Sequence, residues 1–109
     1  MLKKLINAFK TQSWQEAASC FSPQRDTVFT DYGPSMVGGQ CAFIYGPSAI
    51  ELYFRNHFYN NTFSIAQERF ENGYATYFAC YAGRYYLVRL TVEETDAAGL
   101  IKRAVVRPE

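Results

Sequence analysis

The chain has few of the residues that build metal sites, disulfide frameworks or redox centres. Its 109 residues include one histidine and three cysteines, and no two cysteines have the C-x-x-C spacing. An odd number of widely spaced cysteines argues against a disulfide framework and against a zinc site. We therefore expect no metal and no cofactor, and three unpaired thiols suit a reducing compartment.

Charge is also scarce and nearly balanced. Charged residues make up 19% of the chain, the formal net charge is +1, and neighbouring cations occur only at Lys3–Lys4 and Lys102–Arg103. We expect neither a nucleic-acid partner nor a membrane partner, because both require a basic surface or a long apolar run. No run approaches the roughly 18 apolar residues of a membrane span, and MLKKLINAFKTQSW lacks the apolar core of a signal peptide. A soluble cytoplasmic protein is the resulting expectation.

Aromatic residues are abundant: nine tyrosines, nine phenylalanines and one tryptophan make up 17% of the chain. Large rings favour strands, and they fill either a deep core or a ligand pocket. The length suits one domain, residues 1–109, that buries about two-thirds of its unfolded surface. The composition therefore predicts a globular domain with a bulky core or an aromatic-lined pocket.

The first half of the chain predicts three helices. Apolar residues recur at helical spacing at Leu2, Leu5, Ile6 and Phe9. Ser13 and Glu16 have the spacing of a capping box that opens a second helix, which ends before Pro23. Gly46-Pro47-Ser48 opens a third helix, in which Ser48 and Glu51 repeat the capping-box spacing and Asn60-Asn61 gives the stop.

The strands lie mainly in the second half. Thr27–Tyr32 reads as a strand, and Ala42–Tyr45 as either a brief strand or a buried loop. Later strands are predicted at Phe63–Glu71, Tyr74–Ala82, Tyr85–Glu94 and Leu100–Val106, with a hairpin turn at Asn72-Gly73. In the first of these, alternation puts Phe63, Ile65, Gln67 and Arg69 on one side. Three helices followed by an antiparallel meander indicate an α+β fold.

This order of elements resembles the NTF2-like superfamily, and within it the SnoaL-like and ketosteroid-isomerase-like proteins with a cystatin-like α+β cone. The resemblance spans nearly the whole chain and is carried by LINAFKTQSWQEAASCF, VFTDYGP, YGPSAIELYFRNHF and the four late strands. Its most family-like motif is G-x-x-A-I-x-x-[YF]-[FY] at Gly46–Phe54. The resemblance implies three N-terminal helices packed in a strongly curved mixed or antiparallel sheet. It also implies a pocket at the open end of the cone and homodimers through the outer face of the sheet.

Asp31 is the first candidate for a catalytic role. It lies near the end of the first predicted strand, where the resemblance places the catalytic carboxylate of isomerase-like members, and an apolar cavity would make it a stronger base. The other interpretation is an Asx-turn residue that holds Tyr32-Gly33-Pro34. Two partners of the isomerases are missing, because LINAFK contains no tyrosine and YYLVRLTV no carboxyl group before Glu93. We therefore do not expect ketosteroid isomerisation itself.

Five further side chains are candidates for a site. They are His57 as a second catalytic group, and Tyr32, Tyr53, Trp14 and Arg89 as ligand contacts. His57 shares a helical face with Tyr53, so it can act as an acid, a base or a ligand contact, or serve structurally near the helix end. Arg89 would bind an anionic ligand if it faced inward, and would belong to the surface or an interface if it faced outward. The tyrosines can supply hydroxyl donors or simply pack in the core.

The sequence supports three functional hypotheses. The first is a homodimeric domain whose cone pocket binds a small apolar or aromatic ligand. The second is an isomerase, dehydratase or cyclase with Asp31 as general base. The third is a non-catalytic association module that dimerises through the sheet. An open cavity reached by Asp31 and His57 would favour the enzyme, whereas a cone filled by side chains would favour association.

Overall fold

The computed structural model describes residues 1–59, 63–81 and 83–109. Its helices are α1 (Leu2–Thr11), α2 (Trp14–Ser19) and α3 (Pro47–His57), with a short 3-10 helix, η1 (Gly33–Val37), after the first strand. The predicted helix stop at Asn60-Asn61, and Ala82 at the end of a predicted strand, lie outside the described residues. None of the described helices is long and apolar enough to cross a membrane.

Helix starts follow two different capping arrangements. The Ser13 side chain accepts a hydrogen bond from the Glu16 backbone N–H at 3.3 Å, which confirms the predicted start of α2. The second predicted capping box is wrong, because α3 begins directly after Gly46 and no side chain caps it. Gly46 has φ 90°, a conformation that glycine adopts at little cost, and Pro47 then begins the helix with its φ already fixed.

In the described residues, six strands form one mixed sheet in the order β2-β1-β6-β5-β4-β3. Their bounds are β1 Val28–Asp31, β2 Ala42–Tyr45, β3 Ser64–Phe70, β4 Tyr74–Tyr81, β5 Arg84–Thr95 and β6 Ile101–Pro108. The first strand pairs antiparallel with β2 and parallel with β6, and the later neighbours are antiparallel. The α+β prediction is confirmed, and Ala42–Tyr45 is a strand rather than a loop.

A β-bulge in β3 corrects the predicted alternation. Gln67 has φ 55°, and the register against β4 shifts by one residue between Ala66 and Arg69. As a result Ile65 pairs with Ala79, whereas Arg69 pairs with Thr76, a residue on the opposite face of β4. The extra residue bends and twists the β3–β4 hairpin.

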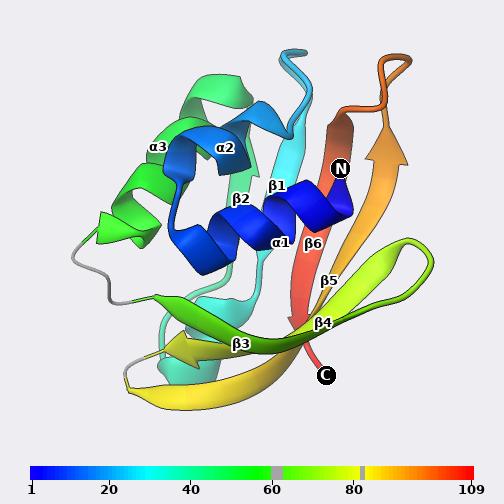
Figure 1. Ribbon diagram of the computed structural model, residues 1–109. Coiled ribbons are helices and arrows are strands. Elements are labelled where there is room, and N and C mark those ends of the chain that lie inside the picture. The colour runs from blue at the N-terminus through cyan, green and yellow to red at the C-terminus, as the bar shows by residue number, and fades with distance from the viewer. Residues whose placement is uncertain (60–62, 82) are drawn as a thin grey trace.

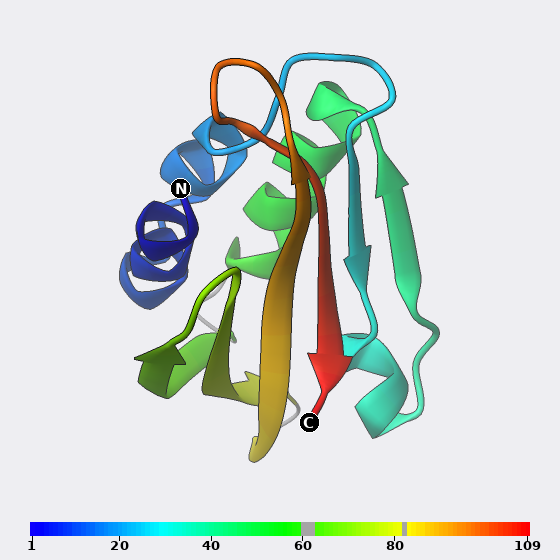
Figure 2. The same cartoon turned by 90° about the vertical axis from the view of Figure 1, so that its right-hand side faces the viewer.

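The sheet is strongly curved and holds the helices on its concave side. Figures 1 and 2 show α1, α2 and α3 on one side of the sheet, with the β3–β4 hairpin curling beneath α1. This curved, open sheet agrees with the cone that the resemblance to NTF2-like proteins implies.

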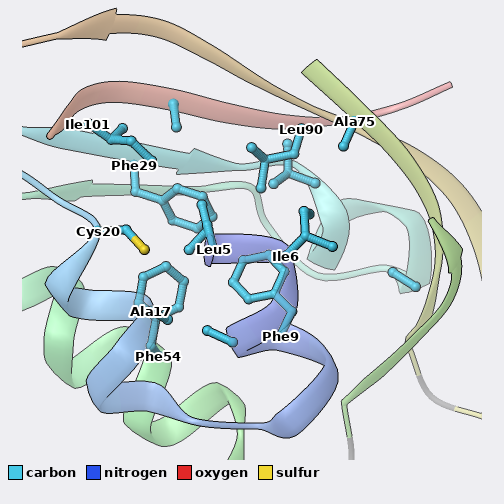
Figure 3. Close-up of a cluster of buried hydrophobic side chains, with 14 of the residues drawn as sticks. Leu5, Ile6, Phe9, Ala17, Cys20, Phe29, Phe54, Ala75, Leu90 and Ile101 are labelled. Carbon is cyan, nitrogen blue, oxygen red and sulfur yellow. The ribbon is translucent and has the colours of Figure 1, made fainter. Parts of the chain in front are cut away.

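Aromatic rings fill the space between the helices and the sheet. Phe9 of α1 packs against four of them, with ring centroids 5.7 to 6.3 Å apart. These partners are Phe54, Phe58, Phe63 and Tyr77. Figure 3 shows Phe9, Phe29 and Phe54 converging with Leu5 and Ile6 inside the cone. The aromatic-rich composition therefore serves a packed core.

Candidate functional site

Asp31 is the last residue of β1, at its C-terminal (inner) end, and it is 2% exposed. Its Oδ1 accepts the backbone N–H of Gly33 at 2.8 Å, and its Oδ2 accepts the hydroxyl of Tyr53 at 2.6 Å. The first bond is an Asx turn that leads the chain into η1. The second ties β1 to α3. Each carboxylate oxygen therefore already accepts one hydrogen bond from the protein.

Gly33 brings a further tyrosine to this carboxylate. A Cβ added at Gly33 would overlap the Tyr81 hydroxyl and would lie 2.8 Å from Asp31 Oδ1. Only a residue without a side chain lets the chain pass between them. Tyr81 comes from β4, so the inner end of β1 meets β4 and α3 at one point.

His57 stands one helical turn after Tyr53 and forms another wall of the site. Its ring stacks on Tyr53 with centroids 5.4 Å apart and lies 4.3 Å from the Phe63 ring. Burial lowers the pKa of His57, and the nearby negative charge of Asp31 offsets part of that effect. The imidazole is therefore neutral at physiological pH and can both donate and accept a hydrogen bond.

The tyrosine hydroxyls of the site remain protonated. Burial raises the pKa of Tyr53 and of Tyr81, and the charge of Asp31 raises both further. The pKa of the fully buried Tyr77 is raised by the same kind of burial. All three can act only as neutral hydrogen-bonding groups across the physiological range, so none of them is a base or a nucleophile there.

The space between these groups is small. The cavity has a volume of about 10 Å³. Its lining is Phe9, Phe29, Asp31, Phe54, His57, Phe63, Tyr77, Tyr81 and Val106. Pockets for drug-sized ligands have roughly 300–1,000 Å³, whereas about 10–15 Å³ accommodates one water molecule. Within the described residues, the cavity that Asp31 lines therefore has room for one water molecule, and an organic substrate would need more space than it offers in this conformation.

Three predicted ligand contacts lie away from this cavity. Trp14 lies in a surface groove between α2 and α3, with the Arg55 guanidinium 5.7 Å from its ring. Tyr32 packs on Phe43 of β2, at 6.0 Å between ring centroids. Arg89 alternates with the buried Val88 and Leu90 along β5, so it points out of the cone and is not placed to bind an anion inside it.

Arg89 is held on the outer face by two neighbours. Its guanidinium binds the Glu109 carboxylate through two hydrogen bonds, at 2.6 and 2.9 Å, and lies 4.1 Å from the Tyr74 ring. It pairs across the sheet with Thr76 and Arg107.

Of the residues predicted from the sequence, the structure brings together Asp31, Tyr53 and His57. Sequence reasoning gave no particular weight to Gly33, Tyr77 and Tyr81 at this site.

The outer face of the sheet carries an exposed apolar patch. We define the outer patch as Ala66, Phe78, Tyr85 and Leu87. Phe78 of β4 pairs with Ala66 of β3 on one side and with Leu87 of β5 on the other, so these three residues form a row across the sheet. Tyr85 is 58% exposed and Leu87 41%. The patch borders a hollow of about 310 Å³ lined by Ala66, Gln67, Phe78 and Tyr85. The outer face thus presents apolar side chains that remain exposed to solvent.

The described part of the chain contains no group of three His, Cys, Asp or Glu side chains placed to hold a metal ion. Cys20 is buried, and burial raises the pKa of its thiol, so it behaves as a small apolar residue there. Cys41 and Cys80 are half-buried and unpaired. These thiols contribute no recognisable chemistry to the Asp31 site.

Solved structures share this fold at low sequence identity. An NTF2-like protein of unknown function from Burkholderia xenovorans LB400 has a TM-score of 0.65 and 14% identity, over 99% of this chain and 79% of that one. A protein of unknown function with a cystatin-like fold from Methylobium petroleophilum PM1 has a TM-score of 0.63 and 16% identity, over 97% of this chain and 71% of that one. A SnoaL-like protein of unknown function from Burkholderia thailandensis has a TM-score of 0.60 and 12% identity, over 98% of this chain and 90% of that one. No family model and no curated protein matches the sequence. The chain therefore has the NTF2-like fold.

Proposed function

We propose that this NTF2-like domain is an association module that forms a homodimer through the outer face of its sheet. The observation that carries the proposal is the contrast between the two faces. The inner face surrounds a cavity of about 10 Å³, whereas the outer face exposes Tyr85 and Leu87 beside a hollow of about 310 Å³. A face that presents contiguous apolar side chains gains free energy when a partner covers it.

The free energy gained by burying the apolar side chains of the outer patch supports an interface centred on it. Full burial of a leucine or aromatic side chain contributes about 1.5–3 kcal/mol. Stable interfaces bury about 800 Å² on each partner, so the contact must extend beyond the patch. Thr76 and the Arg89–Glu109 ion pair form a polar border beside the patch. Thr76 pairs with Arg89 across the sheet, and the Glu109 N–H donates a hydrogen bond to the carbonyl of Leu87, a patch residue. An apolar centre with an arginine-containing rim is the usual composition of an interface.

A second copy of the chain is the partner that the patch fits most simply. Most homodimers have two-fold symmetry, in which the same surface of both subunits meets itself. An apolar patch is self-complementary in that arrangement, because it needs no opposite charge on the partner. Two sheets can stack face to face in this way, with their strands rotated relative to each other by the sheet twist.

The interior site supports a second candidate function. Asp31 is a buried carboxylate in contact with Tyr53, with neutral His57 beside it, and such groups can perform acid–base chemistry on a small apolar or aromatic ligand. In this function Asp31 would be the general base of an isomerase, dehydratase or cyclase. The aromatic rings around the cavity would have to move apart before a substrate entered, so the geometry favours association.

Two matched variants test the association proposal. Leu87→Arg places a charge in the outer patch, whereas Leu52→Arg places the same charge at a leucine of α3 that is 55% exposed. We expect the molar mass of Leu87→Arg, measured by light scattering, to fall to that of a monomer, while Leu52→Arg keeps the wild-type mass. Equal masses for both variants would contradict the outer-patch interface.

The interior candidate has its own test. Asp31→Asn removes the base and keeps the size of the side chain, so it should abolish turnover of any carbonyl compound that the wild-type protein converts. Turnover that persists in this variant would exclude Asp31 as the base. Circular dichroism of the variant shows whether the fold is retained.

A further inference from the structure

We infer that the cavity beside Asp31 is a binding site for one internal water molecule, held by Asp31, His57 and Tyr81. The cavity volume of about 10 Å³ is close to the minimum that a single water molecule needs. Four of the nine side chains that line it carry polar atoms: Asp31, His57, Tyr77 and Tyr81. Buried waters occur in polar cavities of this size, whereas cavities with purely apolar walls stay dry.

The polar groups around the cavity have hydrogen-bonding capacity left over. Each Asp31 oxygen accepts one bond from the protein and has a second lone pair. Among the described residues, the hydroxyls of Tyr77 and Tyr81 and the ring nitrogens of His57 have no hydrogen bond to a protein atom. They are not among the fully buried unpaired side-chain atoms, of which the described residues show only Gln12 Oε1, so a water-sized probe reaches them. Buried polar groups of native proteins are almost always paired, and a water molecule can serve several of them at once.

Water matches this set of partners better than a cation of the same size. An ammonium ion can only donate hydrogen bonds, and the tyrosine hydroxyls need an acceptor. A water molecule can donate to the Asp31 carboxylate and to an unprotonated nitrogen of His57 while it accepts from Tyr81. In that position it connects β1, α3 and β4, which also meet here through the Tyr53–Asp31 hydrogen bond and the contact between the His57 and Tyr81 rings.

A cavity-filling variant tests the site. Val106→Ile adds one methylene group to a residue that lines the cavity, whereas Val88→Ile adds the same group to a buried valine of β5 that does not line it. Oxygen-17 magnetic relaxation dispersion counts long-lived internal waters in solution. We expect Val106→Ile to lose one such water relative to the wild-type protein, and Val88→Ile to lose none. Equal dispersion in the wild-type protein and in Val106→Ile would overturn the inference.

Crystallography of the wild-type protein provides a readout that does not depend on a variant folding. The inference requires an ordered water peak within hydrogen-bonding distance of both Asp31 and Tyr81. A well-defined cavity without such a peak would overturn it. Tyr81→Phe removes one partner and keeps the ring, so the peak should weaken in that variant. None of these readouts depends on the oligomeric state, so the inference can fail or hold independently of the association proposal.

Discussion

The hydroxyl of Tyr53 donates a 2.6 Å hydrogen bond to Oδ2 of Asp31 and thereby joins α3 to the inner end of β1. The two residues are 22 positions apart in the sequence, and Asp31 is 2% exposed. A buried carboxylate is tolerated only where hydrogen bonds replace its hydration. The bond therefore explains how a charged group can occupy the interior of an aromatic core.

Removing this bond should weaken the fold. Tyr53→Phe leaves a carboxylate oxygen without its donor, and a hydrogen bond to a charged group contributes about 1.5–3 kcal/mol. We expect the free energy of unfolding in urea to fall by about 2 kcal/mol. Tyr45→Phe is the control, since Tyr45 is 64% exposed, and its effect should stay within about 0.5 kcal/mol. Similar small changes in both variants would show that the bond contributes little.

Gly33 should not accept a side chain. The methyl group of Gly33→Ala would overlap Tyr81, and overpacking of this kind destabilises a protein by about 1–3 kcal/mol. The double variant Gly33→Ala with Tyr81→Ala makes room for the methyl group. Its loss of unfolding free energy, measured in urea, should therefore be smaller than the sum of the two single losses. Additive losses would mean that the two residues do not interact.

Stability should fall in mild acid because of His57. Burial lowers the pKa of His57 in the folded state below the unfolded value of about 6.5. Between the two values the unfolded chain binds more protons than the folded one, so protonation favours unfolding. The free energy of unfolding should therefore decrease as the pH falls below about 6.5 and through the folded-state pKa.

The single histidine makes a control for this pH dependence straightforward. In His57→Gln the decrease of unfolding free energy just below pH 6.5 should disappear, whereas the titration of carboxylates at lower pH remains. Unfolding curves of both proteins at a series of pH values provide the comparison. The same decrease in both would assign the effect to other groups.

The bulge in β3 should be stabilised by glycine. Gln67 has φ 55°, a conformation that is unfavourable for residues with a Cβ and open to glycine. We expect Gln67→Gly to leave the thermal midpoint unchanged or to raise it, by an amount that corresponds to up to about 1 kcal/mol. Ala66→Gly, at the preceding residue of the same strand, should lower it. A clear loss of stability in Gln67→Gly would argue against the bulge.

The sequence correctly predicted those features that arise between residues close together in the chain. Apolar spacing located α1, and the Ser13–Glu16 capping box located α2, because both arise within one or two helical turns. The Asx turn at Asp31 was also an open interpretation of the sequence, and it depends on a residue two positions away. The strand predicted at Tyr74–Ala82 is present as Tyr74–Tyr81, and its alternation puts Tyr77 and Tyr81 on one buried face, although the sequence alone did not single them out.

The remaining features depend on contacts between distant residues. The bulge at Gln67 could not be predicted, because glutamine has no preference for φ 55° and takes it up only under the constraint of the pairing with β4. The direction of Arg89 depends on which face of β5 meets the helices. The volume beside Asp31 depends on how rings from α1, α3, β1 and β4 interlock, and no short window of sequence specifies that.

We expect the outer face of the sheet to bind a second copy of this chain. Sedimentation velocity of the wild-type protein over a wide range of concentrations tests it most directly. We predict a concentration-dependent rise of the sedimentation coefficient from that of a 12.5 kDa monomer to that of a dimer. A sedimentation coefficient that stays at the monomer value at the highest concentration would contradict a homodimer through this face.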